Sequence, residues 1–301
     1  MPAGGLLALK NRVKSVKTTK KTTKAMSLIS ASKMKKARVK LKQNEVYFSN
    51  LKHMGNKIFM ISDNPEKNIL AMDNLEDKKL YVVLASDTGL CGGFNGNGLS
   101  YLAHKANNNN QEMKEISVIL SGKRARYYAN KHGFTKVKEY KDPNDRITIK
   151  EARVMASDLV DLFLHKGYGE ISLVYTKFIS AGKQNVVEEK ILPFALGETN
   201  EVIEELDYDM EPYSEEVVSD YIMRQIEAQL INAVYHSKTS EHSARMMAMD
   251  NATKNAGKMA IELEAKYNRL RQGAITQEIA EIIGGLEASK KKKKKKEEIK
   301  K

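Results

Sequence analysis

The sequence predicts an α/β protein: long N- and C-terminal helices form an antiparallel coiled coil, and a Rossmann-like α/β domain is inserted between them. Three observations predict this fold. They are a proline-free N-terminal stretch, a middle segment in which apolar runs alternate with helical patterns, and a proline-free C-terminal stretch. The predicted segments are a first helix at 1–61, the inserted domain with an acidic connector at 62–213, a second helix at 214–289 and a lysine-rich tail at 290–301.

The first helix is predicted from residues 7–61, which hold no proline and are rich in lysine, alanine, serine and methionine. A spacing of three and four residues places one stripe of side chains toward a partner helix. The stripe consists of Val13, Val16, Lys20, Thr23, Ser27, Ser30, Met34, Ala37 and Leu41. Small and hydroxylated side chains let two helices approach closely with little apolar contact. We therefore expect a thin and weakly bound coiled coil.

In the middle segment, apolar residues no longer recur only at the helical spacing of the first segment but also form continuous runs. Its continuous apolar runs are typical of strands buried on both faces, and they are 80–85, 116–120 and 171–175. The helical patterns between and beside them are 98–106, 123–131 and 148–166. An edge strand is predicted at 186–192, and Pro193 ends it before the acidic connector at 197–213. This alternation predicts a compact α/β domain with a largely parallel sheet.

The second helix is predicted to be far longer than a domain is wide. At a rise of about 1.5 Å per residue, residues 214–286 would extend about 110 Å, so the helix needs a partner outside a normal core. A coiled-coil seam is predicted at Met249, Ala252, Ala256, Met259, Leu263, Tyr267, Leu270 and Ala274. The first helix is the obvious partner. The lysines of 290–296 cannot pack in a core, so we expect a frayed or disordered tail.

The positive charge is concentrated at the two ends of the chain. Residues 1–42 carry 13 Lys and Arg without an acid, and residues 290–301 add a net +7, so the net +13 of the whole chain leaves −7 for residues 43–289. The ends are therefore expected to meet an anionic surface, such as nucleic acid, anionic lipid or an acidic protein sleeve. No apolar run is long enough for a membrane helix, and Met1–Leu9 does not resemble a secretory signal, so we expect a cytoplasmic protein.

Little in the sequence indicates catalysis. The glycine-rich segment 86–97 follows a strand and precedes a helix, where it could either cradle a phosphate or form a structural turn; the turn is favoured because no complete nucleotide motif is present. The six histidines never occur at a metal-binding helical spacing, and the single Cys91 cannot form a disulfide within the chain. We expect no catalytic residues, no metal and no cofactor.

Five sequence blocks resemble the gamma subunit of F-type ATP synthases, in the order of that family and over nearly all of the chain except the tail. The blocks are 15–26 (SVKTTKKTTKAM), 31–34 (ASKM), 86–95 (SDTGLCGGFN), 240–256 (SEHSARMMAMDNATKNA) and 271–285 (RQGAITQEIAEIIGG). The resemblance implies that the two terminal helices form a rotor shaft inside a ring of three alpha and three beta subunits. It also implies that the α/β domain binds epsilon and the membrane c-ring, so this chain would be a non-catalytic subunit that meets the membrane only through the complex.

The resemblance also implies a set of rotor–stator contact residues. They are Lys24, Met26, Lys33, Arg245, Arg271, Gln272, Thr276, Gln277 and Glu278. Structural turn positions are expected at Gly89, Gly92 and Gly93. A cationic shaft in an anionic sleeve fits the charge pattern of the first helix, and a seam of small residues keeps the shaft narrow. The expected location is the cytoplasmic face of a bacterial plasma membrane, as a peripheral subunit.

Two other functions compete with this one. A gamma paralogue of a specialised rotary ATPase would share these blocks but drive something other than a c-ring. A basic coiled-coil nucleic-acid binder would use the charged ends. We disfavour a nucleic-acid partner because residues 1–46 contain no Phe or Tyr for base stacking, although phosphate contacts alone need none.

Overall fold

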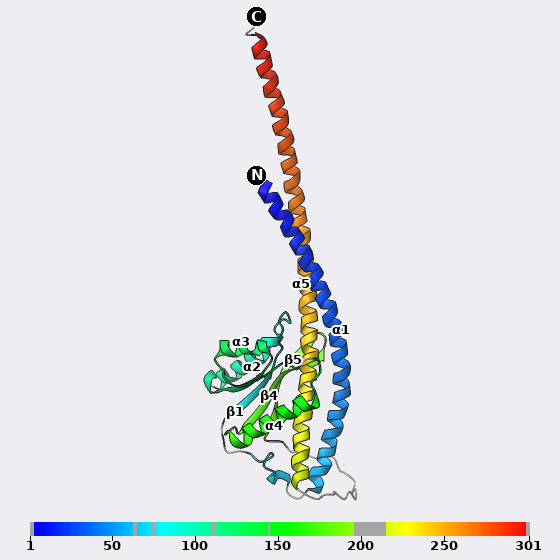
Figure 1. Cartoon of the computed structure of the whole chain (residues 1–301), viewed down its shortest axis with the longest axis vertical. Helices are drawn as coiled ribbons and strands as arrows, with labels where there is room; N and C mark the ends of the chain where they lie inside the picture. Colours follow the sequence, from blue (N-terminus) through cyan, green and yellow to red (C-terminus); the bar gives the residue numbers. More distant parts are fainter. Residues whose placement is uncertain are drawn as a thin grey trace. The chain divides into compact units, whose positions relative to one another are not determined.

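The computed structural model describes residues 3–62, 65–73, 76, 78–109, 112–143, 145–195 and 215–298. The chain divides into two compact units (Figure 1). We call residues 27–248 the base unit, and residues 1–26 together with 249–301 the shaft unit. The predicted segment boundaries lie at the ends of the long helices, whereas the boundaries between the two units fall within these helices. The predicted acidic connector at 197–213 lies outside the described residues.

The base unit contains a five-stranded sheet with the order β3-β2-β1-β4-β5. Its strands are β1 (Lys79–Leu84), β2 (Ser117–Ser121), β3 (Thr135–Tyr140), β4 (Glu170–Ser180) and β5 (Lys183–Leu192). The first four strands pair in parallel and β5 pairs antiparallel with β4. The largely parallel α/β sheet is thus confirmed. The predicted edge strand is the second half of β5, which forms a hairpin with β4.

Helices cover both faces of this sheet (Figure 1). The helices of the inserted domain are α2 (Phe94–Asn108), α3 (Lys123–His132) and α4 (Ile149–His165), and the short 3-10 turns are η1 (Pro65–Lys67) and η2 (Met113–Glu115). Along β1, Tyr81 and Val83 pack with α2 and α3, while Leu80 and Val82 pack with α4 and the long helices. Because successive strand residues point to opposite faces, burial on both faces explains the continuous apolar run.

Two long helices begin and end the described chain. They are α1 (Ala3–Ile61) and α5 (Glu215–Glu298). In the base unit, α5 contributes fully buried Ile222, Ile226 and Leu230 to the larger apolar cluster. The two helices approach closely where Gly55 faces Tyr221, since a Cβ on that glycine would lie 1.8 Å from the phenol oxygen. The phenol hydroxyl donates to the carbonyl oxygen of Leu51 at 3.3 Å.

In the shaft unit, α1 and α5 run antiparallel. The hydroxyl oxygens of Thr23 and Thr253 are 2.8 Å apart, and Lys17 of α1 forms an ion pair with Glu264 of α5. The predicted α1 seam is buried or half-buried throughout except for Lys20, which is exposed. Along the other helix, the predicted Met259 is 45% exposed and Ala260 is buried in its place. The seam prediction was therefore wrong by one residue there, because a small side chain fits the close helix approach better than a long one.

Two further expectations were wrong. The helix does not end near residue 289, because α5 continues to Glu298 through the tail that we expected to be frayed or disordered. Lysine and glutamate are good helix formers, so they can extend a helix that has already begun. The sequence also missed β3, whose alternating charges (TKVKEY) contain no apolar run. An edge strand with exposed lysines needs none, since only its backbone pairs with β2.

Candidate functional site

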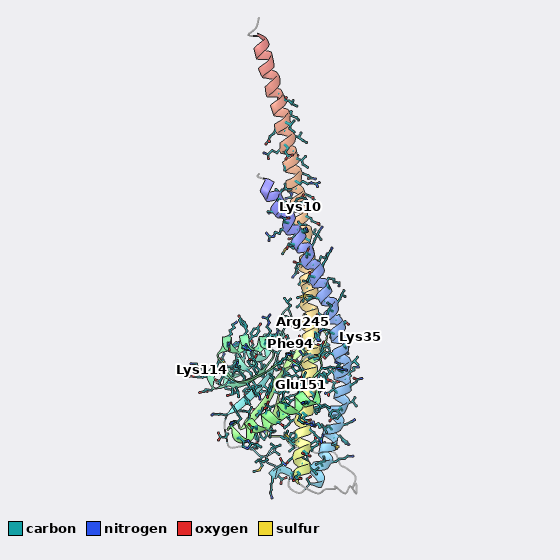
Figure 2. All side chains as sticks on the ribbon, viewed as in Figure 1. Lys10, Lys35, Phe94, Lys114, Glu151 and Arg245 are labelled. Carbon is teal, nitrogen blue, oxygen red and sulfur yellow. The ribbon has the colours of Figure 1, made fainter. Side chains whose placement is uncertain are left out.

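A cluster of charged residues lies on one face of α5 in the base unit. Lys238, Glu241, His242 and Arg245 recur at spacings of three and four residues, so they share one stripe of the helix. All four are buried, although charged side chains are rarely buried without partners. Figure 2 labels Arg245 on the part of α5 that runs beside the inserted domain. The partners come from two loops at the carboxyl edge of the parallel strands and from α1.

Lys238 is the centre of the buried part of this cluster. Its ammonium lies 2.6 Å from Oδ2 of Asp142 and 3.0 Å from Oε2 of Glu241, and its side chain is only 8% exposed. Asp142 lies in the loop after β3, and Oδ2 also accepts from the backbone N–H of Asp87 at 3.3 Å. Removing either carboxylate would leave the buried ammonium with one partner fewer, and breaking a buried charge network is among the more costly changes in a protein interior.

Asp142 and Glu241 both pair with Lys238, but their pKa values are shifted in opposite directions. Burial raises the pKa of Asp142 to about 6, although Lys238 acts in the opposite direction. The pKa of Glu241 is lowered despite its burial, because it faces both Lys238 and Arg245. The pKa of Lys238 is raised, since the two carboxylates outweigh the effect of burial on the ammonium. Asp142 is therefore the first acid of the cluster to take up a proton.

Arg245 joins α5 to the glycine-rich loop. Its Nη2 donates to Oε1 of Glu241 at 2.8 Å and to the hydroxyl of Thr88 at 2.7 Å, and Nε donates to the carbonyl oxygen of Gly89 at 3.3 Å. The guanidinium is thus engaged within the chain, where a fork of fixed donors can hold several acceptors at once. Its predicted contact with a stator subunit stays a prediction.

His242 and Asp145 extend the cluster to α1. Nε2 of His242 lies 2.9 Å from Oδ1 of Asp145, and Nη1 of Arg245 lies 3.5 Å from Nδ1. Burial lowers the pKa of His242, and an arginine donor at Nδ1 fits the neutral tautomer that carries its proton on Nε2. Lys33 pairs here with Oδ2 of Asp145 at 3.1 Å, and its predicted contact with a stator subunit stays a prediction.

The glycine-rich loop is held by its own polar groups. The amide oxygen of Asn95 accepts from the backbone N–H of Ser86 at 2.8 Å and from its hydroxyl at 2.9 Å, while the amide nitrogen donates to the carbonyl oxygen of Thr88 at 3.0 Å. Gly92 has a φ of +60°, as the predicted structural turn requires. Leu90, with φ +63°, takes a similar conformation that the sequence did not indicate.

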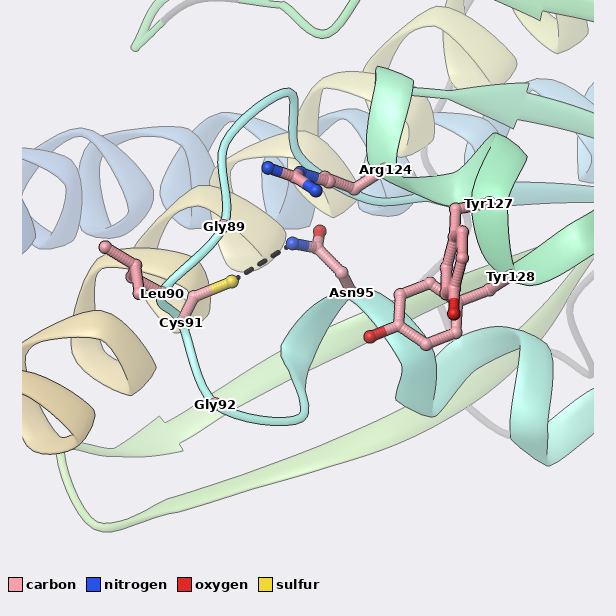
Figure 3. Close-up of a pocket in the computed structure, with 8 residues that line it drawn as sticks. All are labelled: Gly89, Leu90, Cys91, Gly92, Asn95, Arg124, Tyr127 and Tyr128. Atoms are coloured by element: carbon pink, nitrogen blue, oxygen red, sulfur yellow. Dashed lines mark hydrogen bonds between the residues drawn. The ribbon is translucent and has the colours of Figure 1, made fainter.

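A cavity of about 380 Å³ lies beside this loop. Figure 3 shows Asn95 of α2 reaching Cys91, with Arg124, Tyr127 and Tyr128 of α3 along the cavity. The cavity is open and its arginine is exposed. An added Cβ at Gly93 would lie 2.7 Å from Oδ1 of Asn97, and one at Gly89 would lie 3.4 Å from Arg124. Only Gly93 therefore sits where the backbone passes close to a side chain, since 3.4 Å is an ordinary contact distance.

The other predicted contact residues lie in the shaft unit. Lys24 is exposed on α1 and Met26 is half-buried. The remaining five are exposed on α5, namely Arg271, Gln272, Thr276, Gln277 and Glu278. Arg271, Gln277 and Glu278 help to line an open groove of about 600 Å³, whose other wall includes Gly5 and Leu6 of α1. Nothing within the described shaft unit buries these five side chains, so they are available to a partner.

Sequence reasoning missed a set of exposed apolar side chains on α5. They are Ile275, Ile279, Ile282, Ile283 and Leu286, between 47% and 64% exposed. The groove beside the start of α1 ends at Glu278, so later residues of α5 extend past that end of α1 (Figure 1). The sequence did contain a signal for this stripe, since the five residues follow an i, i+4, i+7, i+8 and i+11 spacing that places them on one face of a helix. Exposed apolar stripes of this kind mark surfaces that bind a partner.

Within the described residues, no group of three or more His, Cys, Asp or Glu side chains is arranged to hold a metal ion. The described helices also include none that is both long and apolar enough to cross a membrane.

Two long antiparallel helices that begin and end the described chain, an inserted α/β domain and an exposed apolar stripe in the last third of α5 define the class of stalk subunits in larger assemblies. The family model described as ATP synthase matches residues 5–288. The ATP synthase gamma chain of Clostridium perfringens strain SM101 is 44% identical over 291 residues, which cover 96% of this chain and 100% of that protein. The gamma chain of Clostridium novyi strain NT is 40% identical over 291 residues, which again cover 96% of this chain and 100% of that protein. The chain belongs to the ATP synthase gamma chain family, a non-catalytic subunit of the synthase.

Solved structures show the same fold at lower identity. A chain of the Euglena gracilis mitochondrial ATP synthase rotor, rotational state 1, has a TM-score of 0.64 at 17% identity, covering 91% of this chain and 100% of that chain. A chain of the OSCP/F1/c-ring structure in rotational state 3 has a TM-score of 0.68 at 16% identity, covering 95% of each. At these identities the likeness concerns the fold alone, and it confirms the predicted combination of long helices with an α/β domain.

Proposed function

We propose that this chain is the central rotor shaft of an F-type ATP synthase, turning inside three alpha and three beta subunits. Its rotation would be coupled to the nucleotide state of that hexamer and, through epsilon and the c-ring, to ion translocation. The family places the chain in the central stalk. The coupling and the partners are what the proposal adds. The complex would hold the chain at the cytoplasmic face of a bacterial plasma membrane.

The exposed end of α5 is the observation that carries the proposal. Five large apolar side chains from Ile275 to Leu286 are exposed, and those after Glu278 lie beyond the groove that α5 forms with the start of α1. Burying such side chains stabilises a complex by about 1.5–3 kcal/mol for each one fully covered. A sleeve that surrounds the helix would cover all sides of it, as a ring of alpha and beta subunits would.

Charge and asymmetry explain how such a shaft would act. The first 42 residues are strongly cationic, so an acidic segment of beta would attract one face of α1 more than another. Because only α1 and α5 form the shaft unit, its cross-section has no three-fold symmetry. Each angle would then favour one conformation in each surrounding subunit, and linkage requires that nucleotide state favours an angle in return. The chain itself needs no covalent chemistry for this role.

Purification of the native complex tests the proposal. We expect tagged chain to bring down alpha and beta in three copies each, together with epsilon and the c-ring. In the isolated complex, a bead attached to the base unit should rotate while ATP is hydrolysed. Reproducible absence of a c-ring, with another adaptor bound instead, would show a specialised rotary ATPase and overturn the coupling to ion translocation.

The nucleic-acid alternative has a simple test. A phosphate-binding arm would show affinity for DNA or RNA that falls steeply with salt. We expect filter binding by the assembled complex to show no such affinity, because the cationic helix would be covered by the sleeve. Salt-sensitive binding that persists in the complex would contradict this expectation.

A further inference from the structure

Asp145 contacts three separate parts of the base unit. Oδ1 accepts from Nε2 of His242 on α5 at 2.9 Å, and Oδ2 pairs with Lys33 of α1 at 3.1 Å. Its backbone carbonyl oxygen accepts from Nζ of Lys40 at 2.9 Å. Asp145 itself belongs to the loop between β3 and α4, so one residue joins the α/β domain to both long helices.

The same loop is anchored a second time. Three residues earlier, Asp142 pairs with buried Lys238, one turn before His242 on α5. Pro143, which lies between the two contacts, is buried as well. We call residues 141–143 and 145–146 the latch loop. Its two carboxylates therefore bind side chains on successive turns of α5. Two such contacts restrain both the position and the direction of the loop.

Several of the α1 side chains that face inward around Lys33 are small, namely Ser27, Ser30 and Ala37. A seam of small residues allows close approach but gives weak resistance to sliding or rolling, because it buries little apolar area and few interlocking side chains. Polar contacts with fixed geometry supply the resistance that such a seam lacks.

Because Asp145 contacts both long helices, we propose that the latch loop holds α1 and α5 at fixed positions against the α/β domain. We call this arrangement the lock, and Asp145 is its positioning residue. The proposal rests on the rotor function proposed above, in which torque must pass between the domain and both helices. It also gives Lys33 a different role from the predicted stator contact: this lysine acts within the rotor by holding Asp145.

A double-mutant cycle in the reconstituted complex separates these roles. The variants are Lys33→Ala, Asp145→Ala and the pair together, and the readout is the ratio of proton pumping to ATP hydrolysis in sealed vesicles. If both residues serve one lock, each single variant should lower the ratio by about two- to fivefold, the range that an exposed ion pair supports, and the double variant should lower it no further.

The controls keep the test specific. Asp145→Glu should restore most of the ratio, because it preserves the charge. Lys35→Ala removes the same charge from an exposed position of α1, labelled in Figure 2, and should behave as wild type. Hydrogen exchange in the assembled complex should become faster in residues 33–41 of the Asp145→Ala variant, and unchanged exchange there would overturn the lock even if assembly were impaired.

The outcomes are distinguishable. A normal ratio for Asp145→Ala beside a reduced ratio for Lys33→Ala would overturn the lock and favour the stator contact. Additive losses would do the same, since they would show two independent roles. If wild-type complex itself failed to couple hydrolysis to pumping, the proposed rotor function would fall, and the lock with it. A shared, non-additive loss with normal wild-type coupling supports both.

Discussion

The base unit and the shaft unit are built from the same two helices, yet they are stabilised differently. In the base unit, α5 packs its apolar face into a cluster whose members are almost fully buried, and the opposite face of the sheet carries a second such cluster. In the shaft unit, α5 has a seam of mostly half-buried residues and exposes most other side chains. The base unit can therefore hold its own fold, whereas the shaft unit depends more on what surrounds it.

A pair of matched substitutions on α5 tests this contrast most strongly. Leu230→Ala removes a fully buried side chain from the base unit and should lower the free energy of unfolding by about 2–5 kcal/mol. Leu263→Ala, in the half-buried seam of the shaft unit, should cost about 1 kcal/mol or less in the isolated chain. Denaturant unfolding followed by peptide-resolved hydrogen exchange measures both, and equal losses would contradict the contrast.

The second prediction concerns acid sensitivity, which should belong to the base unit because all six histidines lie within residues 27–248. Burial, assisted by Lys177, lowers the pKa of His236 to about 4 from 6.5. A lowered folded pKa means that its contribution is fully present above pH 6.5 and is lost as the pH falls toward 4. By linkage that loss is about 3 kcal/mol.

The measurement is the stability difference between wild type and His236→Gln across this pH range. A difference is needed because Asp142, with its pKa raised to about 6, acts with the opposite sign: its ionised form is disfavoured in the folded state, so stability is gained as the pH falls through 6. Wild type should lose about 3 kcal/mol relative to the variant between pH 6.5 and 4. A constant difference would show that His236 is not buried in its neutral form.

A smaller effect is expected in the shaft unit, where hydroxyl groups take the place of apolar contacts. Thr253→Val removes the hydroxyl that lies 2.8 Å from that of Thr23, and should destabilise the pairing of the two helices by about 0.5–1.5 kcal/mol. Thr19→Val is the control, since that hydroxyl bonds only within α1, to the carbonyl oxygen of Ser15. Hydrogen exchange in residues 249–260 reports the difference, and equal effects of the two variants would count against a specific contact.

The smallest effect on folding is expected from Lys24→Glu. The side chain is exposed, so stability should change by no more than about 0.5 kcal/mol. Coupling in the reconstituted complex should nevertheless fall, because the reversed charge would face an acidic sleeve. Lys24→Arg preserves the charge and should couple normally. Normal pumping per ATP in Lys24→Glu would make the electrostatic account of the shaft wrong.

The fold could be predicted from local patterns because those patterns follow directly from burial. Runs such as 80–85 predicted buried strands, and Thr148 with Glu151 forms the capping box that begins α4. Local sequence patterns did not predict the features of the fold that burial of apolar side chains does not determine. The charged strand β3 pairs with β2 without an apolar run of its own, and the choice of Ala260 over Met259 depends on how closely α1 approaches.

The candidate site was only partly predictable for a similar reason. The block 240–256 indicated that Arg245 matters, but nothing in the spacing of residues along the chain connects it with Thr88, or Asp145 with Lys33. Those pairs are separated by more than 100 positions and meet only because the fold places one loop of the α/β domain against α5 and another against α1 as well as α5. The exposed isoleucines were visible as a pattern, but their exposure required the structure.

By itself, the sequence determined that the chain has two proline-free helices with a narrow seam, an α/β domain between them and a cationic start. Each of these properties follows from side-chain periodicity and charge, which are local to the chain. Only the tertiary structure decided which charged groups are engaged inside the molecule and which remain free for a partner. That division depends on contacts between distant segments, and such contacts are set by packing rather than by any property of a single stretch.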